Sequence, residues 1–106
     1  AKWAPIHDVF QDNFSKEHGG KVEGLALGIG GDRCPQLLYR LENGELPDTL
    51  QSQVFWVLIG TNNLADHCTV ENIVAGNIQI VEKLRSLRPN AKVVVNSILP
   101  RGKPGM

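Results

Sequence analysis

The sequence predicts a small α/β domain in which helices cover a parallel sheet. Helix-like and strand-like segments alternate along the 106 residues, in the order helix, strand, helix, strand, helix, strand. This alternation is typical of parallel strands that are connected by crossover helices. The run Val54–Ile59 is apolar throughout and rich in β-branched and aromatic residues, as expected for a strand buried on both faces. A chain of this length forms at most one small domain.

The first half of the chain predicts two helices and one strand. Residues 5–18 repeat apolar side chains at intervals of three and four, which predicts a helix that stops at the glycines 19–20. Val22–Ile29 is a short apolar run mixed with glycine and is interpreted as a strand. Cys34–Leu41 predicts a second helix with its leucines on one side.

The second half contains the clearest helical periodicity. Thr69 is a plausible N-cap for a helix over 70–87. Gly76 inside this helix costs up to about 1 kcal/mol relative to alanine, so we interpret it as a point of close packing on the sheet. Pro89 ends the helix, because the residue before a proline avoids the α region. Val93–Val95 then begins a third strand.

Composition excludes several functional classes. Eleven basic and eleven acidic residues cancel, and no basic stripe interleaved with aromatics supports nucleic-acid binding. The longest apolar run is too short to span a membrane, and residues 1–5 show no signal-peptide pattern. Cys34 and Cys68 lack a C-x-x-C spacing, so we expect two free, partly buried thiols and no zinc site. The compartment stays open.

Two polar clusters each follow a strand-like run. The first is Gly28-Ile29-Gly30-Gly31-Asp32, and the second is Gly60-Thr61-Asn62-Asn63. Open α/β sheets bind ligands at the carboxyl ends of their strands, where both clusters are expected. The first offers glycine amides and the second a side-chain amide, and together they predict the donors of an oxyanion hole. The alternatives are a glycine-rich turn without a ligand and an asparagine that adopts a left-handed turn conformation.

A dinucleotide or phosphate site is a weaker alternative for the first cluster. Gly28 and Gly30 fit the first two places of a G-x-G-x-x-G motif, but Arg33 occupies the third. No acidic residue follows at the end of a second strand. We therefore predict no nucleotide cofactor.

The chain offers no convincing nucleophile or base. His7 and His18 lie on or beside the first helix, and His67, although it follows Asp66, is interpreted as a surface-loop residue. None of the serines stands in a nucleophile-elbow sequence; they are Ser15, Ser52, Ser86 and Ser97. Asp32 is expected to fix the glycine loop by accepting backbone N–H bonds.

Four segments resemble, in order and spacing, the SGNH (GDSL-type) hydrolase family, and the likeness covers nearly the whole chain. The segments are 28–32, 38–46, 60–63 and 99–102. By this resemblance, Gly31 matches the glycine and Asn62 the asparagine that donate to the oxyanion hole. The family's Gly-Asp-Ser block and its Asp-x-x-His block are not in this sequence, so the span holds no nucleophile.

The resemblance also implies a fold. The family has a flavodoxin-like, three-layer α/β/α fold with a parallel sheet in the strand order 2-1-3-4-5. The strands here are then the second, third and fourth, and the absent first strand belongs between Val22–Leu27 and Val54–Ile59. Its absence leaves a gap of ~10 Å and two open strand edges. We therefore expect 1–106 to be the central portion of one SGNH hydrolase-like domain, with the first strand and the C-terminal part missing. Further chain, a protein partner or direct re-pairing of the two strands is needed to complete the sheet.

The favoured hypothesis is a serine ester hydrolase of which this chain carries only the oxyanion-hole blocks. The resemblance implies a small acyl ester as substrate, no metal or organic cofactor, homodimers among relatives and, by analogy, a cytoplasmic location. The alternative is a non-catalytic scaffold or accessory subunit of a larger assembly. A Gly-Asp-Ser sequence upstream of these residues would favour the enzyme.

Overall fold

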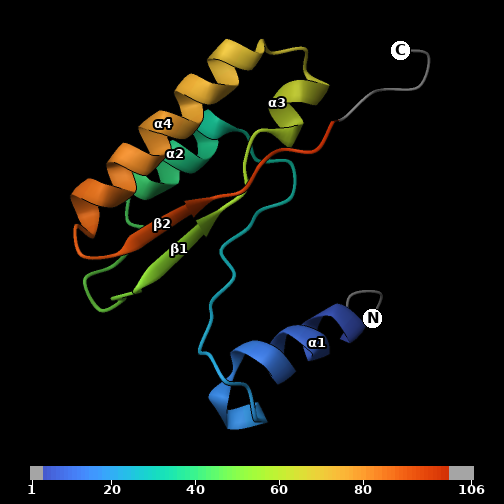
Figure 1. The fold of residues 1–106 in the computed structure, drawn as a ribbon, viewed down its shortest axis with the longest axis vertical. Helices are drawn as coiled ribbons and strands as arrows, with labels where there is room; N and C mark the ends of the chain where they lie inside the picture. The colour runs from blue at the N-terminus through green and yellow to red at the C-terminus, as the bar shows by residue number, and fades with distance from the viewer. Residues whose placement is uncertain (1–3, 101–106) are drawn as a thin grey trace.

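A layer of two helices covers one face of a two-stranded sheet, while the first helix lies apart at the end of an extended segment (Figure 1). The computed structural model describes residues 4–100. The helices of the layer are α2 and α4, and the short α3 follows the first strand. The elements are α1 (Ala4–Phe14), the 3-10 helix η1 (Lys16–His18), α2 (Cys34–Glu42), β1 (Val54–Val57), α3 (Thr61–Ala65), α4 (Val70–Leu87) and β2 (Lys92–Val95).

The two strands pair in parallel, as the alternation of elements predicts. Val54 lies opposite Lys92, and Val57 lies opposite Val95. Helix α4 makes the crossover between the strands and packs against α2 above the sheet. The pairing agrees with the strand order that the resemblance implies, in which the third and fourth strands are neighbours, and the structure is consistent with a partial α/β fold of this kind.

The expected strand over Val22–Ile29 is wrong. This segment is extended but pairs with no strand among residues 4–100, and Val22, Leu25 and Ile29 are each more than half exposed. An extended run becomes a strand only when a neighbour takes up its backbone N–H and C=O groups. No described segment does so, and the run has not re-paired directly with β1.

Burial of Val54–Ile59 on both faces is also contradicted. Val57 and Ile59 are buried beneath the helices, whereas Trp56 and Leu58 are 70% and 60% exposed. Successive side chains of a strand point to opposite faces, so a single helical layer buries every second residue. Within the described part of the chain, the third layer of an α/β/α arrangement is not formed.

The core lies between the sheet and the α2–α4 layer. Ile80 is its only fully buried large side chain among the described residues. The cluster around it consists of Cys34, Leu41, Leu46, Val57, Ile59 and Leu84. Gly76 marks a close approach, but of α4 to α2, because an added Cβ would lie 2.7 Å from the Cβ of Cys34. The expectation that Gly76 packs on the sheet is thus corrected.

The ends of α4 are held by two side chains. Thr69 is the N-cap, and its hydroxyl accepts the backbone N–H of Asn72 at 3.2 Å. Beyond the other end, the buried guanidinium of Arg88 donates to the carbonyl oxygens of Leu46, Pro47 and Leu50. Arg88 thereby ties the helix end to the loop before β1. No helix within residues 4–100 is long and apolar enough to cross a bilayer.

Candidate functional site

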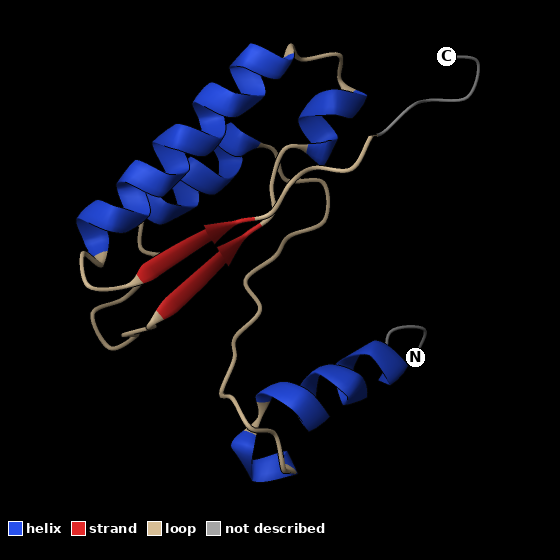
Figure 2. Ribbon diagram, viewed as in Figure 1, coloured by secondary structure: helices blue, strands red, loops and turns tan. Residues whose placement is uncertain are grey.

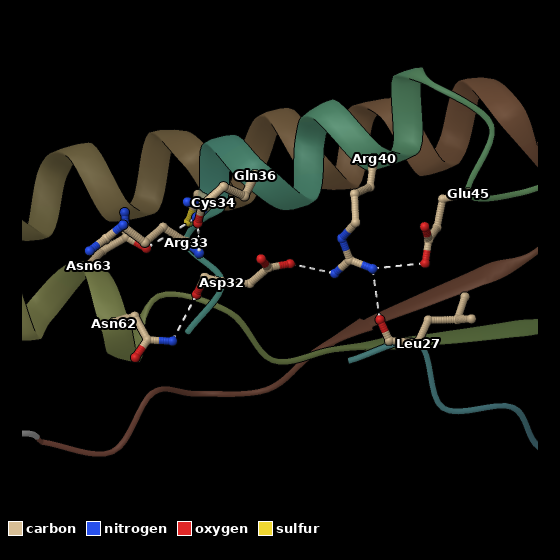
Figure 3. A network of polar contacts seen from close by, with 9 residues as sticks. All are labelled: Leu27, Asp32, Arg33, Cys34, Gln36, Arg40, Glu45, Asn62 and Asn63. Atoms are coloured by element: carbon tan, nitrogen blue, oxygen red, sulfur yellow. Dashed lines mark hydrogen bonds and ion pairs between the residues drawn. The ribbon is translucent and has the colours of Figure 1, made fainter. Parts of the chain in front are cut away.

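The two polar clusters meet beyond the carboxyl ends of the strands. Figure 2 shows both arrowheads pointing toward the loops that contain them. The side-chain Nδ2 of Asn62 donates to the carbonyl oxygen of Asp32 at 2.9 Å, and the backbone N–H of Cys34 donates to Oδ1 of Asn63 at 3.1 Å (Figure 3). Segments thirty residues apart are therefore joined directly, with Asn62 bonded to the residue that follows Gly31.

Gly31 occupies a backbone conformation that favours glycine. Its φ is +87°, and an added Cβ would meet no atom within 4 Å. The residue is exposed, so the space around its α-carbon is open. Among the described residues, the space beside the α-carbon of Gly31 is therefore unoccupied.

Helix α3 places the two asparagines. Both lie in its first turn, and neither has a positive φ, which overturns the reading of a left-handed turn asparagine. Asn63 is buried, and its side-chain Oδ1 accepts the backbone N–H of Cys34. Its backbone oxygen accepts the N–H of Cys68 at 3.0 Å. Sequence reasoning gave Asn63 no such bridging role. Its place beside Asn62 was the only signal.

An ion pair fastens the same two segments a second time. Arg33, at the N-terminus of α2, pairs with Asp66, directly after α3. His67 follows in an exposed turn with φ +62°, in keeping with a surface-loop residue. His7 and His18 belong to α1 and η1, which lie apart from these loops (Figure 1).

A second polar network joins α2 to the glycine loop. The guanidinium of Arg40 donates to the carboxylates of Asp32 at 2.6 Å and Glu45 at 2.8 Å, and to the carbonyl oxygen of Leu27 at 2.8 Å (Figure 3). Asp32 therefore holds the loop through Arg40 and not by accepting backbone N–H bonds, which corrects the expected role. Sequence reasoning missed Arg40, although Arg40 and Glu45 both stand in the matched segment 38–46.

A groove of about 530 Å³ lies between α2 and α4. Both free cysteines line it, beside Tyr39 and Asn72. Burial raises the pKa of the Cys34 thiol above its ordinary 9.0, and the neighbouring Cys68 adds to the rise. A buried thiol of raised pKa is a poor nucleophile at neutral pH. Across residues 4–100, no group of three or more histidine, cysteine, aspartate or glutamate side chains is arranged to hold a metal ion.

Comparisons with known proteins agree with the family resemblance of the four sequence segments. The model of the GDSL-like lipase/acylhydrolase family matches residues 2–106. Platelet-activating factor acetylhydrolase IB subunit alpha1 of Rattus norvegicus is 38% identical over 96 residues, which are 91% of this chain and 38% of that protein. Subunit alpha2 of Homo sapiens is 36% identical over 97 residues, which are 92% of this chain and 39% of that protein. The chain thus spans about two fifths of the length of the curated relatives it matches.

The likeness to these relatives is also visible in the motifs. The segments 28–32, 38–46, 60–63 and 99–102 resemble the catalytic subunits of intracellular platelet-activating-factor acetylhydrolase, and the identities above bear this resemblance out. Residues 101–102 lie outside the described residues.

Proposed function

The chain belongs to the GDSL-like lipase/acylhydrolase family, and from this premise we propose that it carries the oxyanion-hole part of a serine ester hydrolase. In the full natural polypeptide, a serine outside these residues attacks an acyl carbonyl, and a histidine oriented by an aspartate acts as the base. Gly31 N–H and the Asn62 side chain stabilise the oxyanion that forms. The chemistry is acyl transfer to water, with no metal or organic cofactor in the scheme.

The contact between Asn62 and Asp32 carries the proposal. An oxyanion hole needs donors from separate segments that converge before the reaction begins. The bond from Asn62 Nδ2 to the carbonyl oxygen of Asp32 fixes the plane of the amide one residue away from Gly31. This bond keeps Asn62 next to the loop that contains Gly31, which supports the proposal that the two residues act as a pair of donors.

The names of the relatives support a proposal for the substrate and the partner. They are named acetylhydrolases, so a short acyl ester, first of all an acetyl ester, is the substrate to test. They are also named subunits, which supports a protein partner. Fold alone does not determine the leaving group.

Asn62→Ala in the full natural polypeptide tests the proposal. The change is expected to lower kcat for a short acyl ester by about 10²–10³ with little change in KM, because the donor acts on charge that appears only in the transition state. Asn43→Ala is the matched control. Its side-chain amide also donates to a backbone carbonyl, that of Tyr39 at 2.7 Å, but at the far end of α2. An unchanged kcat in Asn62→Ala contradicts the assignment.

A non-catalytic subunit is the second candidate. Residues 1–106 contain neither a Gly-Asp-Ser nor an Asp-x-x-His sequence. Intact mass and a peptide map of the natural polypeptide decide between the two. Peptides that carry both motifs favour the enzyme, and a full polypeptide without them favours the scaffold.

A further inference from the structure

We infer that Arg40 is a positioning residue for the oxyanion hole: through Asp32, its guanidinium sets where Gly31 and the side chain of Asn62 stand. The inference rests on the proposed function and deepens it. Arg40 does not touch the substrate in this scheme. It acts through the loop 28–32, which it contacts from α2 by bonds to Asp32 and to the neighbouring Leu27 (Figure 3).

The contacts of Arg40 are short and sheltered. Its side chain is 16% exposed, and those of Asp32 and Glu45 are 15% and 22% exposed. Sheltered ion pairs are screened less by salt than surface pairs, and charge-assisted bonds of this length are strong. The guanidinium is anchored on α2, which packs against α4 in the core. The network is therefore a rigid support for a loop that has little structure of its own.

Asp32 connects this support to both donors. Its carboxylate accepts from Arg40, while its backbone carbonyl oxygen accepts from Asn62 Nδ2. It also directly follows Gly31, which has positive φ and no neighbour within 4 Å of an added Cβ. Glycine has more backbone freedom than any other residue, so a loop with Gly28, Gly30 and Gly31 depends on an outside contact to keep one conformation.

Arg40 also joins the loop to the segments on both sides of it. One terminal nitrogen donates to the carbonyl oxygen of Leu27 and to Glu45, and the other donates to Asp32. A lysine ammonium is a point charge on a flexible stem and does not reproduce this planar fork. Arginine is thus required by the geometry and not only by the charge.

Stability alone is a poor explanation for this network. Nε of Arg40 is buried and has no hydrogen-bond partner among the described residues, which is unfavourable for the fold. Sheltered ion pairs are often no more stabilising than apolar groups of the same volume. A positioning role accounts for a cluster that costs desolvation and leaves one donor unpaired.

Loss of Arg40 is expected to destabilise the transition state and to leave substrate binding nearly unchanged. A shift of the donors by about 1 Å weakens the stabilisation of the oxyanion and lowers the rate by up to about 10²-fold, while the ester itself binds as before. Arg40→Met in the full natural polypeptide is therefore expected to lower kcat by about 10- to 100-fold with KM nearly unchanged. Arg40→Lys is expected to recover only part of this loss.

Arg88→Met is the matched control. Arg88 is likewise a sheltered arginine that donates to backbone carbonyl oxygens, but it lies at the end of α4 and does not contact the loop 28–32. It is expected to lower the thermal midpoint without a selective fall in kcat below that midpoint. Asp32→Asn is expected to lower kcat as Arg40→Met does, and the two changes together are expected to be far from additive, since they break one connection.

A second measurement keeps the inference testable if no ester is turned over. The side-chain amide resonance of Asn62 in ¹⁵N-labelled protein reports its environment without any reaction. It is expected to shift in Arg40→Met and to stay in place in Arg88→Met. If wild type and Asn62→Ala are equally inactive, the proposed function fails, and this resonance decides only whether Arg40 positions the side chain of Asn62. Equal kcat in the two arginine variants of an active enzyme, or an Asn62 resonance unmoved by Arg40→Met, overturns it.

Discussion

Gly60 lies between the candidate site and the core, and its replacement by alanine is expected to lower the free energy of unfolding. Its φ is +122°, and a side chain in such a sparsely populated region costs about 1–3 kcal/mol. An added Cβ would also lie 2.6 Å from Cδ1 of Ile98 and 2.8 Å from Cγ2 of Ile73. The Ile98 methyl is the end of a flexible side chain, but Ile73 is buried and cannot move aside freely. Overpacking of this kind costs typically about 1–3 kcal/mol more.

The sum for Gly60→Ala is a loss of about 2–6 kcal/mol in the free energy of unfolding. Gly31→Ala is the comparison. It also has a positive φ but meets nothing within 4 Å, so only the backbone strain of about 1–2 kcal/mol applies. Urea unfolding of the full natural polypeptide, followed by circular dichroism, measures both. Equal losses in the two variants would refute the claim that Gly60 is constrained by its neighbours.

Three further predictions concern the helical layer and the groove. Arg88→Ala is expected to lower the free energy of unfolding by about 2–4 kcal/mol in urea melts, because four backbone carbonyl oxygens lose a charged donor. A smaller loss than an alanine substitution of an exposed arginine causes would contradict this prediction. Thr69→Ala is expected to cost about 1 kcal/mol through the lost N-cap bond, and Thr69→Ser to restore most of it. Burial raises the pKa of Cys34, so the folded chain keeps a proton that the unfolded chain loses. The free energy of unfolding is therefore expected to fall as pH rises above about 9.0, and Cys34→Ala is expected to remove this pH dependence. Iodoacetamide is expected to react more slowly with Cys34 than with the less buried Cys68.

Helices α2 and α4 and the strand pairing were predictable because local patterns decide them, whereas α3 was not predicted and the helix expected over 5–18 ends at Phe14. The periodicity over 70–87 and the cap at Thr69 are properties of neighbouring residues, and α4 begins and ends where they indicate. Parallel pairing of β1 with β2 follows from a helix between two apolar runs. The run 22–29 is apolar and mixed with glycine but is not a strand here, because pairing depends on a partner that its own residues do not specify.

The candidate site likewise has one part that the sequence predicts and one part that only the fold shows. The glycine and asparagine clusters stand out in the sequence, since each directly follows a strand-like run, where open α/β sheets bind ligands. The bonds that join them do not stand out. Arg40, Asn63 and Arg33 are ordinary helix or loop residues by pattern. Only the fold brings them to their partners, which are Asp32, Cys34 and Asp66 respectively.

The sequence by itself indicated the family, the helices α2 and α4, the parallel pairing of β1 with β2 and the candidate donors Gly31 and Asn62, because motif spacing and local periodicity are properties of neighbouring residues. Tertiary structure alone decided which face of β1 is covered, that Gly76 meets α2, and that Arg40 reaches Asp32. These outcomes depend on contacts between residues far apart in the chain. The local sequence pattern indicates whether a segment favours burial or strand pairing. Only the fold supplies the neighbouring residues that bury its side chains and bond to its backbone groups.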